Sequence, residues 1–448
     1  TASAVVSNKT FMADRGTLSD NCLVGLAARP AAGHKGSFGA NVSVAGWYRQ
    51  SHNALDLAKY FGGGTTDATR LGTMTINAAE VTFETDAGTV TLNPRRSEYG
   101  AQLNWTQCLS KFVKGLSLSV DVPVVHVATD MRASYTQTAG TQIDNLFEGG
   151  TLTYTTPTHK VLAFQKHSTT ANSETGVADV AVSVGYKFAG DADYKVCGSI
   201  DAVIPTGKKP AAVWAMEPLY GSKHFQLGAS LNAMFNLWRS EDGKSAFDFD
   251  AAVHYKYGFC AKEVRTLGLY NHTTSALVDI GHYRCVANAE ADGVSTLANQ
   301  SSLEVDVTPE SRIDAVAGFN YRFNSFNIGA HYNLCYNQEE TVKYRTGTWT
   351  TAKAKFGLAT AGDNTDETVA VAGGVIGKPG DTTTTTYYLS LPAATTPSRV
   401  THKVGGNIDY NFNTATPVNV GVFGEGEFSN NNDSVNSWAV GAKVGFCF

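Results

Sequence analysis

The stretch WAVGAKVGFCF, from Trp438 to Phe448, decides how the rest of the sequence is interpreted. On an extended strand, consecutive side chains point to opposite faces, so residues two apart share a face. One face of this stretch is small or polar, whereas the other is continuously apolar and carries Trp438, Val440, Ala442, Val444, Phe446 and Phe448. The pattern predicts a β-strand with one face against an apolar medium and with aromatic rings at both ends of that face.

Eleven other segments of the chain alternate in the same way, and the links between them are alternately long and short. An up-and-down barrel with its long loops at one end predicts this order, whereas a soluble sandwich has no reason to produce it. Weaker alternating pieces inside the long links could add strands in pairs, so the count is even, with twelve as the floor and 16 as the ceiling. The eleven segments are residues 36–50, 99–106, 116–124, 180–188, 194–204, 225–237, 247–259, 313–323, 326–336, 402–412 and 418–428.

The last strand, with its terminal Phe, resembles the closing strand of Gram-negative outer-membrane β-barrels of the porin and major outer-membrane protein type. The resemblance implies an all-β, closed, antiparallel transmembrane barrel with short periplasmic turns and long extracellular loops. It also implies an integral location in a bacterial outer membrane, with Phe446 and Phe448 as the signal read by the barrel-assembly machinery. The implied partners are outer-membrane lipid, lipopolysaccharide and, as barrels of this kind often form trimers, two further copies of the chain.

Composition agrees with a membrane barrel and argues against a nucleic-acid partner. The 448 residues contain no run of about 18 apolar residues, so a membrane-spanning form must cross as strands. A mean hydropathy of -0.16 suits a barrel, because only alternate residues of each strand face lipid. The net charge of -5 gives no basic footprint. The start at Thr1, without a leader, suggests an exported chain in its mature form.

Two regions follow from this pattern. Residues 36–448 are expected to form the barrel. Residues 1–35 show no sustained alternation and are expected to form an N-terminal segment that acts as a periplasmic or lumen plug.

The inward positions of the strands carry charges of both signs. Unpaired buried charge is costly, so these groups must either pair across the lumen or stand in water. Both outcomes stay open: a water-filled channel of weak ion selectivity, or a dry internal network. The predicted pore-lining residues are Arg49, Asp121, Lys187, Lys195, Asp201, Asp248, Asp250, His254, Lys256, Asp314, Arg322, Lys403, Asp409, Glu425 and Lys443.

The function that this pattern favours is a porin, a water-filled channel for passive diffusion of small hydrophilic solutes. One alternative is a plugged transporter for hydrophobic compounds, in which residues 1–35 resemble the hatch of fatty-acid transporters. The other is a structural major surface protein, since a cysteine-rich barrel linked into a coat resembles the major outer-membrane proteins of chlamydia-like bacteria.

The seven cysteines make disulfides plausible in an oxidising compartment, with at least one thiol left over. Five have inward parity, namely Cys108, Cys197, Cys260, Cys335 and Cys447. We expect Cys22 to pair with Cys108, Cys197 or Cys447 and thereby tether the N-terminal segment, and Cys285 to pair with Cys260 or Cys335. The alternative is that most are free thiols in the barrel wall.

No enzyme constellation stands out. The glycine-rich stretch at residues 373–379 has the wrong spacing for a phosphate loop and a proline where Ser or Thr must reach the metal. Neither a C-x-x-C nor an H-x-x-x-H cluster is present. The sequence therefore predicts a protein that is not an enzyme and binds no metal or cofactor.

Overall fold

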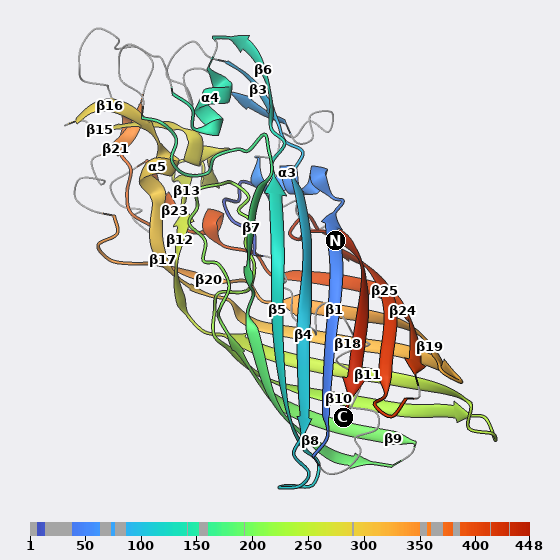
Figure 1. Ribbon diagram of the computed structural model, residues 1–448. Coiled ribbons are helices and arrows are strands. Elements are labelled where there is room, and N and C mark those ends of the chain that lie inside the picture. The colour runs from blue at the N-terminus through green and yellow to red at the C-terminus, as the bar shows by residue number, and fades with distance from the viewer. Residues whose placement is uncertain are drawn as a thin grey trace.

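The computed structural model has an antiparallel barrel of twelve strands, beneath a layer of smaller sheets and helices (Figure 1). It describes residues 7–13, 38–62, 73–76, 87–140, 142–151, 160–191, 193–288, 291–349, 356–359, 371–379, 386–412, 414–429 and 431–448. The barrel strands are β1 (Ala40–Ser51), β4 (Arg95–Cys108), β5 (Leu116–Asp130), β8 (Val180–Gly190), β9 (Tyr194–Ile204), β10 (Gln226–Arg239), β11 (Ser245–Gly258), β18 (Glu310–Phe323), β19 (Phe326–Asn337), β24 (Arg399–Phe412), β25 (Val418–Ser429) and β26 (Ser437–Cys447).

Each barrel strand pairs with the barrel strands before and after it in the chain, and β26 pairs with β1 to close the ring. The closing register runs from Asn41 opposite Cys447 to Ser51 opposite Ser437. All twelve strands expected from alternation are therefore confirmed, and so is the closed up-and-down antiparallel topology. The barrel of the described residues stays at the floor of the predicted range.

The outer surface of the barrel is apolar because the alternating apolar residues point outward. On β25 and β26, Val422 is 57% exposed and Val440 is 51% exposed, whereas their neighbours Phe423 and Ala439 point inward and are buried. Phe448 is 59% exposed on the same outer face. A one-residue slip of any strand would move its whole apolar set into the lumen, so this exterior also fixes the register.

Short turns join the strands at the end of the barrel where β26 ends. Asn324 takes a left-handed φ of 51° in the link between β18 and β19, a conformation that Asn tolerates better than most residues. In the link between β10 and β11, the Asp242 carboxylate accepts hydrogen bonds from Ser240 Oγ at 2.7 Å and from the Lys244 backbone N–H at 3.0 Å. Local turn chemistry therefore produces the short links at this end.

One barrel strand is interrupted. The upper half of β5 pairs with β7 (Asn172–Val177) and the lower half with β8, and the two partners are separated by Ala178 and Asp179. The interruption lies beside Pro123 of β5, which has no N–H to donate to the ladder. The Ala178 backbone N–H still donates to Pro123 O at 2.9 Å. The side chain of Ala178 is buried inside the barrel.

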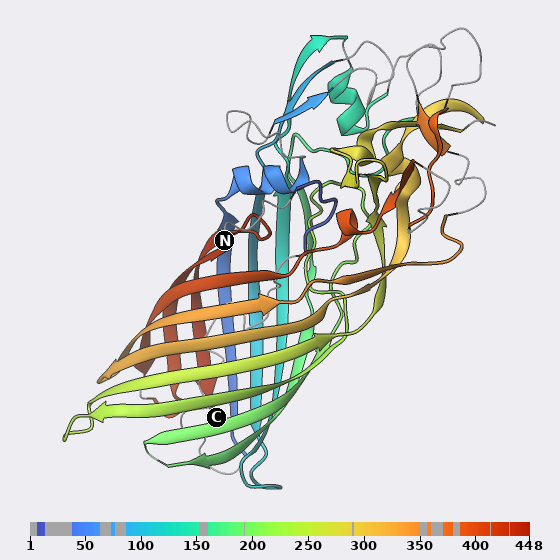
Figure 2. The ribbon, with the colours of Figure 1, turned by 180° about the vertical axis from the view of Figure 1, so that it is seen from behind.

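The long links gather at the opposite end and form what we call the loop layer (Figure 2). Its strands and helices are β2 (Thr73–Ile76), β3 (Ala87–Thr91), β6 (Ser134–Ala139), β12 (Ala261–Thr266), β13 (Gly268–Asn271), β14 (Ala276–Leu277), β15 (Cys285–Asn288), β16 (Ala291–Thr296), β17 (Ser302–Thr308), β20 (Thr341–Tyr344), β21 (Phe356–Ala359), β22 (Val371–Val375), β23 (Tyr387–Ser390), α3 (Ala54–Phe61), α4 (Ile143–Glu148) and α5 (Leu297–Ser301).

These strands form four small sheets apart from the barrel, and buried side chains of α3, α4 and α5 share one apolar cluster. The weaker alternating pieces of the long links are residues 81–85, 89–92, 152–162, 283–286 and 386–391. Those at 89–92, 283–286 and 386–391 overlap β3, β15 and β23 and therefore belong to the loop layer, whereas residues 81–85 and 152–159 lie outside the described residues. None of the helices in the described part of the chain has both the length and the apolar character of a transmembrane helix.

The described part of the N-terminal segment, residues 7–13, also lies in the loop layer. The Lys9 backbone N–H donates to Tyr60 O at 3.0 Å, and the Thr10 backbone N–H donates to Ala393 O at 3.0 Å. This stretch is therefore at the end of the barrel opposite to Phe38, which precedes β1. The remainder of residues 1–35 lies outside the described residues, and the plug stays a prediction.

Candidate functional site

A polar cavity of about 440 Å³ occupies one side of the barrel lumen. Its wall comes mainly from β4, β5, β8, β9, β10 and β11, with a few residues of β1, β24, β25 and β26, and is rich in Ser, Thr and Asn side chains. It reaches the end of the barrel that carries the short turns, because Ser110, Gly115 and Pro417 of those turns are among its lining. At about 15 Å³ of probe volume per water molecule, a space of this size has room for roughly thirty waters.

Of the residues that the structure describes, six with acidic or basic side chains line this cavity: Asp121, Lys187, Lys195, Asp201, His254 and Lys256. The Asp121 carboxylate accepts hydrogen bonds from the side-chain amides of Gln102 at 2.9 Å and Asn104 at 2.7 Å. The Asp201 carboxylate accepts one from Ser199 Oγ at 2.7 Å. All six were predicted to line the lumen, and the structure brings them to one wall.

The other side of the lumen is filled by buried ion pairs, which we call the packed wall. Lys403 Nζ lies 2.9 Å from Glu425 Oε1 and 3.7 Å from Glu427 Oε2, and the same Glu427 oxygen lies 2.9 Å from Arg49 Nη2. Lys443 Nζ lies 3.0 Å from Asp409 Oδ1. Every one of these side chains is at most 6% exposed. The packed wall is a network of buried ion pairs, and whether it is dry stays a prediction.

The four remaining predicted pore-lining residues also have polar partners and do not line the cavity. Arg322 Nε lies 2.7 Å from Asp248 Oδ2 near the short-turn end. Asp314 pairs with Arg312 at 2.6 Å, and Asp250 accepts a hydrogen bond from Asn320. Inward parity was therefore not enough to distinguish a side chain that meets the cavity from one that is fixed in an ion pair.

An apolar cluster lies inside the lumen, a feature that the sequence analysis missed. It is made by Ala45 and Trp47 of β1, Val125 and Val127 of β5, Ala178, and Phe423 of β25, with Tyr220 packed against it. The Trp47 indole N–H donates to the Glu98 carboxylate at 3.0 Å, which fixes the ring. The signal was available, because Trp47 and Phe423 are apolar residues on the inward parity.

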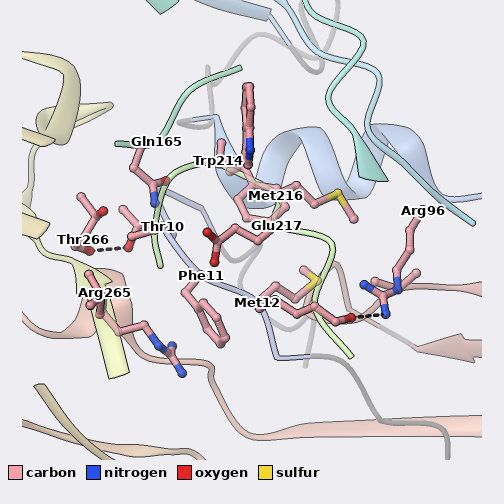
Figure 3. A pocket seen from close by; sticks show the side chains of 16 residues that line it. Thr10, Phe11, Met12, Arg96, Gln165, Trp214, Met216, Glu217, Arg265 and Thr266 are labelled. Atoms are coloured by element: carbon pink, nitrogen blue, oxygen red, sulfur yellow. Dashed lines mark hydrogen bonds between the residues drawn. The ribbon is translucent and has the colours of Figure 1, made fainter. Parts of the chain in front are cut away.

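Above the barrel, a second and much smaller pocket lies between the N-terminal stretch and the loop layer (Figure 3). Its volume is about 30 Å³, room for about two water molecules. Phe11, Met12 and Met216 give it an apolar lining, while Arg96 and Arg265 lie at its sides. The Arg96 guanidinium donates to Leu219 O at 2.8 Å.

Arg265 is the centre of a buried charge cluster in the loop layer. Its guanidinium lies 2.6 Å from Glu263 and 3.4 Å from Glu340, and the Phe11 ring packs on its face. His224 Nε2 lies 3.0 Å from the other oxygen of Glu263. Burial would raise the pKa of Glu263, but Arg265 and His224 lower that pKa to about 2. For the neighbouring Lys223, burial disfavours the charged ammonium group and lowers its pKa to about 8.

Two histidines are buried without charge in the loop layer. The Tyr283 hydroxyl donates to Gln165 O at 2.6 Å and lies 3.0 Å from His167 Nε2, so it accepts the proton of that nitrogen. The His282 ring packs on Tyr283 at 4.1 Å. Burial lowers the pKa of His167 and of His282 to about 3. Neither cluster has a sequence signal, because its members come from separate loops.

The cysteine predictions have mixed outcomes. Cys108, Cys197 and Cys260 are free thiols in the structure, so the predicted pairing of Cys285 with Cys260 is wrong. Cys285 instead packs with Ala287 and Val294 in the loop layer. The pairing of Cys22 with Cys108 or Cys197 is wrong for the same reason. Cys22 itself lies outside the described residues, and its pairing with Cys447, like that of Cys285 with Cys335, stays a prediction.

No group of three or more His, Cys, Asp or Glu side chains that could hold a metal ion occurs in the described ranges. The inward cysteines Cys108, Cys197 and Cys447 line the polar cavity together with Lys187 and Lys195. This wall offers hydrogen-bonding groups and charged side chains to the cavity.

No family model and no curated protein matches the sequence. An outer membrane channel from Pseudomonas putida F1 is 10% identical with a TM-score of 0.41, covering 94% of this chain and 99% of that chain. The NanC porin is 8% identical with a TM-score of 0.31, covering 90% and 98%, and a mutant of the TodX monoaromatic hydrocarbon channel is 8% identical with a TM-score of 0.32, covering 92% and 89%. Likenesses at these levels carry no argument about function. The strand pairing itself gives the chain the fold of a porin-type outer-membrane β-barrel.

Proposed function

We propose that the protein is an integral outer-membrane channel through which small hydrophilic solutes cross by passive diffusion. The observation that carries the proposal is the polar cavity of about 440 Å³ inside a barrel whose outer surface is apolar. A barrel that is polar inside and apolar outside suits a water path through lipid.

The apolar exterior supports a membrane location by its size. Large aliphatic and aromatic side chains are exposed on every barrel strand, among them Val44, Ile200, Leu231 and Ile328. Removing one such side chain from water is worth about 1.5–3 kcal/mol, so a few dozen of them represent tens of kcal/mol. Contact with lipid would remove these side chains from water. A soluble monomer would keep them in water at that cost in free energy.

We infer that the apolar cluster of Trp47, Val125, Val127 and Phe423 narrows the passage through the lumen. A hydrophobic constriction opposes ion flow by excluding water, although it needs no large movement to become wet. Solute passage in this proposal therefore depends on how often the cluster opens.

The plugged transporter for hydrophobic compounds is the weaker candidate. It is favoured by the apolar lining of the small pocket, with Phe11, Met12 and Trp214. A drug-sized apolar ligand needs about 300 Å³ or more, about ten times the volume of this pocket. The pocket would have to expand greatly, whereas the lumen cavity already has room for solutes and water.

Conductance of the purified protein in a planar bilayer tests the proposal. We expect discrete openings with ohmic current. Absence of openings, together with a hydrophobic ligand retained through purification, would support the transporter instead. Dense ordered arrays on cells with little conductance would support the surface-coat alternative.

We also propose that the C-terminal strand is the signal for membrane assembly and that the barrel contacts lipopolysaccharide and further copies of itself. Phe446 and Phe448 point outward at the end of β26, where the barrel-assembly machinery could bind them. Substituting Phe448→Ser should lower the amount of inserted protein while Phe446 is kept; full insertion of that variant would count against the signal. Lipopolysaccharide contact and trimer formation are testable by native mass measurement of protein extracted with its lipids.

A further inference from the structure

The cavity wall carries three lysines, Lys187, Lys195 and Lys256, but only two carboxylates, those of Asp121 and Asp201. Asp121 and Asp201 both accept hydrogen bonds from neighbouring neutral side chains. Their backbone partners on β8 are Ala181 and Ser183, near the loop side of that strand. The carboxylates of the cavity thus lie towards its inner part and are already solvated by protein groups.

Lys187 and Lys195 lie at the other side of the cavity, towards the short turns. They come from β8 and β9 on either side of a register shift, where Lys187 pairs with Cys197 and Lys195 pairs with Gly190. Lys187 is exposed and Lys195 is half-buried. Neither ammonium group forms an ion pair with a carboxylate of the described residues. Both groups lie within electrostatic reach of the Cys197 thiol, which also lines the cavity.

The packed wall cannot neutralise these two lysines. Its carboxylates Glu425, Glu427 and Asp409 are each held against Lys403, Arg49 or Lys443. A buried carboxylate that already has a cationic partner would lose that partner if it turned towards the cavity, and the loss is strongly unfavourable. No carboxylate in the described part of the chain pairs with Lys187 or Lys195, so their positive charge acts on whatever occupies the cavity.

We propose that the cavity selects small anionic solutes, with Lys187 and Lys195 as the residues that determine this preference. The inference rests on the proposed channel function and names its substrate class. In a low-dielectric wall, two unpaired ammonium groups concentrate anions and repel cations at the entrance from the short-turn end.

Cys197 is a native reporter that tests the local potential without any current. Sulfonatoethyl and trimethylammonioethyl methanethiosulfonate carry opposite charges, and the same thiolate attacks the sulfenyl sulfur of each and expels methanesulfinate. When each rate is divided by the rate of that reagent with a small free thiol, the ratio of the two cancels both the thiolate fraction and the intrinsic difference between the reagents. We expect the anionic reagent to modify Cys197 about tenfold faster at low salt, with a smaller ratio at high salt. Peptide mass spectrometry separates Cys197 from Cys108 and Cys447.

The double variant K187Q/K195Q should bring that ratio close to one. The matched control K111Q/K114Q removes two exposed lysines of the turn after β4 that do not line the cavity, and it should keep the ratio of the unmodified protein. A ratio near one in the unmodified protein, or a ratio unchanged in K187Q/K195Q, would overturn the proposal.

Reversal potentials in a KCl gradient provide the second readout. We expect chloride to be several-fold more permeant than potassium, K187Q/K195Q to lose the preference and K187E/K195E to invert it. Open channels with equal permeability in all three proteins would overturn the selectivity while leaving the channel function intact. Absence of current with the thiol ratio preserved would instead reject the channel and keep the anion-attracting site.

Discussion

The two sides of the lumen are built from the same residue types and end in opposite states. On the packed wall, Lys403 is 2% exposed and lies between two carboxylates. On the cavity wall, Lys187 is exposed and has no carboxylate partner among the described residues. Both lysines occupy inward positions of alternating strands. The difference shows that partners on neighbouring strands, and not inward parity, decide whether a lumen charge is structural or available to solutes.

The largest expected contrast is in stability. Substituting Lys403→Met leaves Glu425 buried without a cationic partner, while Glu427 keeps only Arg49. The variant should lose about 3–5 kcal/mol of unfolding free energy. The matched change Lys187→Met, on the cavity wall, should stay within about 0.5 kcal/mol. Urea unfolding of the reconstituted barrel, followed by tryptophan fluorescence, measures both. Equal losses would mean that the two walls do not differ as described.

The next contrast is in chemical access. Cys197 lies on the cavity wall and is half-buried, whereas Cys335 of β19 is 0% exposed. In protein treated with reductant beforehand, a neutral maleimide should therefore modify Cys197 at least about a hundredfold faster, since Cys335 must wait for the barrel to open. Cys260 is exposed just after β11 and serves as the fast internal reference. Similar rates for Cys197 and Cys335 would show that the cavity is closed to solutes of that size.

A third change alters the apolar cluster that lies inside the lumen. Phe423→Ala removes a ring of the apolar cluster and should raise unit conductance roughly two- to fivefold by making the constriction easier to wet. The control is Val422→Ala on the same strand, because Val422 points outward and is 57% exposed. If both variants conduct like the unmodified protein, the cluster is not the narrowest point of the path.

The smallest effect is expected from a change in pH, which should lower the stability of the loop layer more than that of the barrel. His167 and His282 have folded pKa values of about 3, below the ordinary value of 6.5, so the unfolded loop layer binds protons first as pH falls. Their stabilising contribution is present above pH 6.5 and is lost as pH falls towards 3. Between pH 7.5 and 6, each histidine should cost about 1 kcal/mol.

Hydrogen exchange of the loop-layer amides measures this loss, and His282→Leu should weaken the pH dependence. The exposed His272 provides the control, because His272→Gln should leave the dependence unchanged. An equal pH response in the barrel strands would show that acid acts on the lumen charges and not on these two rings.

Much of the fold could be predicted from the sequence, because the strands of a barrel alternate strictly between outward apolar and inward residues. The alternation at residues 247–259 and 438–448 predicted which side chains of those strands face outward and which face inward. The order of long and short links predicted the up-and-down topology. The apolar lumen cluster was also readable, since Trp47 and Phe423 stand on the inward parity. Their role was missed because an apolar residue there has no obvious purpose until its partners across the lumen are known.

The division of charges could not be read in the same way. Nothing local distinguishes Lys187 from Lys403, because each is a lysine at an inward position of an alternating strand. Lys403 finds Glu425 and Glu427 on the neighbouring strand, through the register of β24 with β25. The cluster around Arg265 is harder still, since Glu340 comes from a loop about 75 residues further on.

The pairing of β26 with β1 has a consequence for how such a chain is made. Every other barrel pairing joins consecutive barrel strands, but this seam joins Asn41 to Cys447, roughly 400 residues apart. Until the final strand has been synthesised, the half-built sheet keeps two open edges whose N–H and C=O groups have no partners, and hydrocarbon does not tolerate them. A chain that ended one strand early could not form this seam, so in a membrane the edges of β1 and β25 would be left without partners.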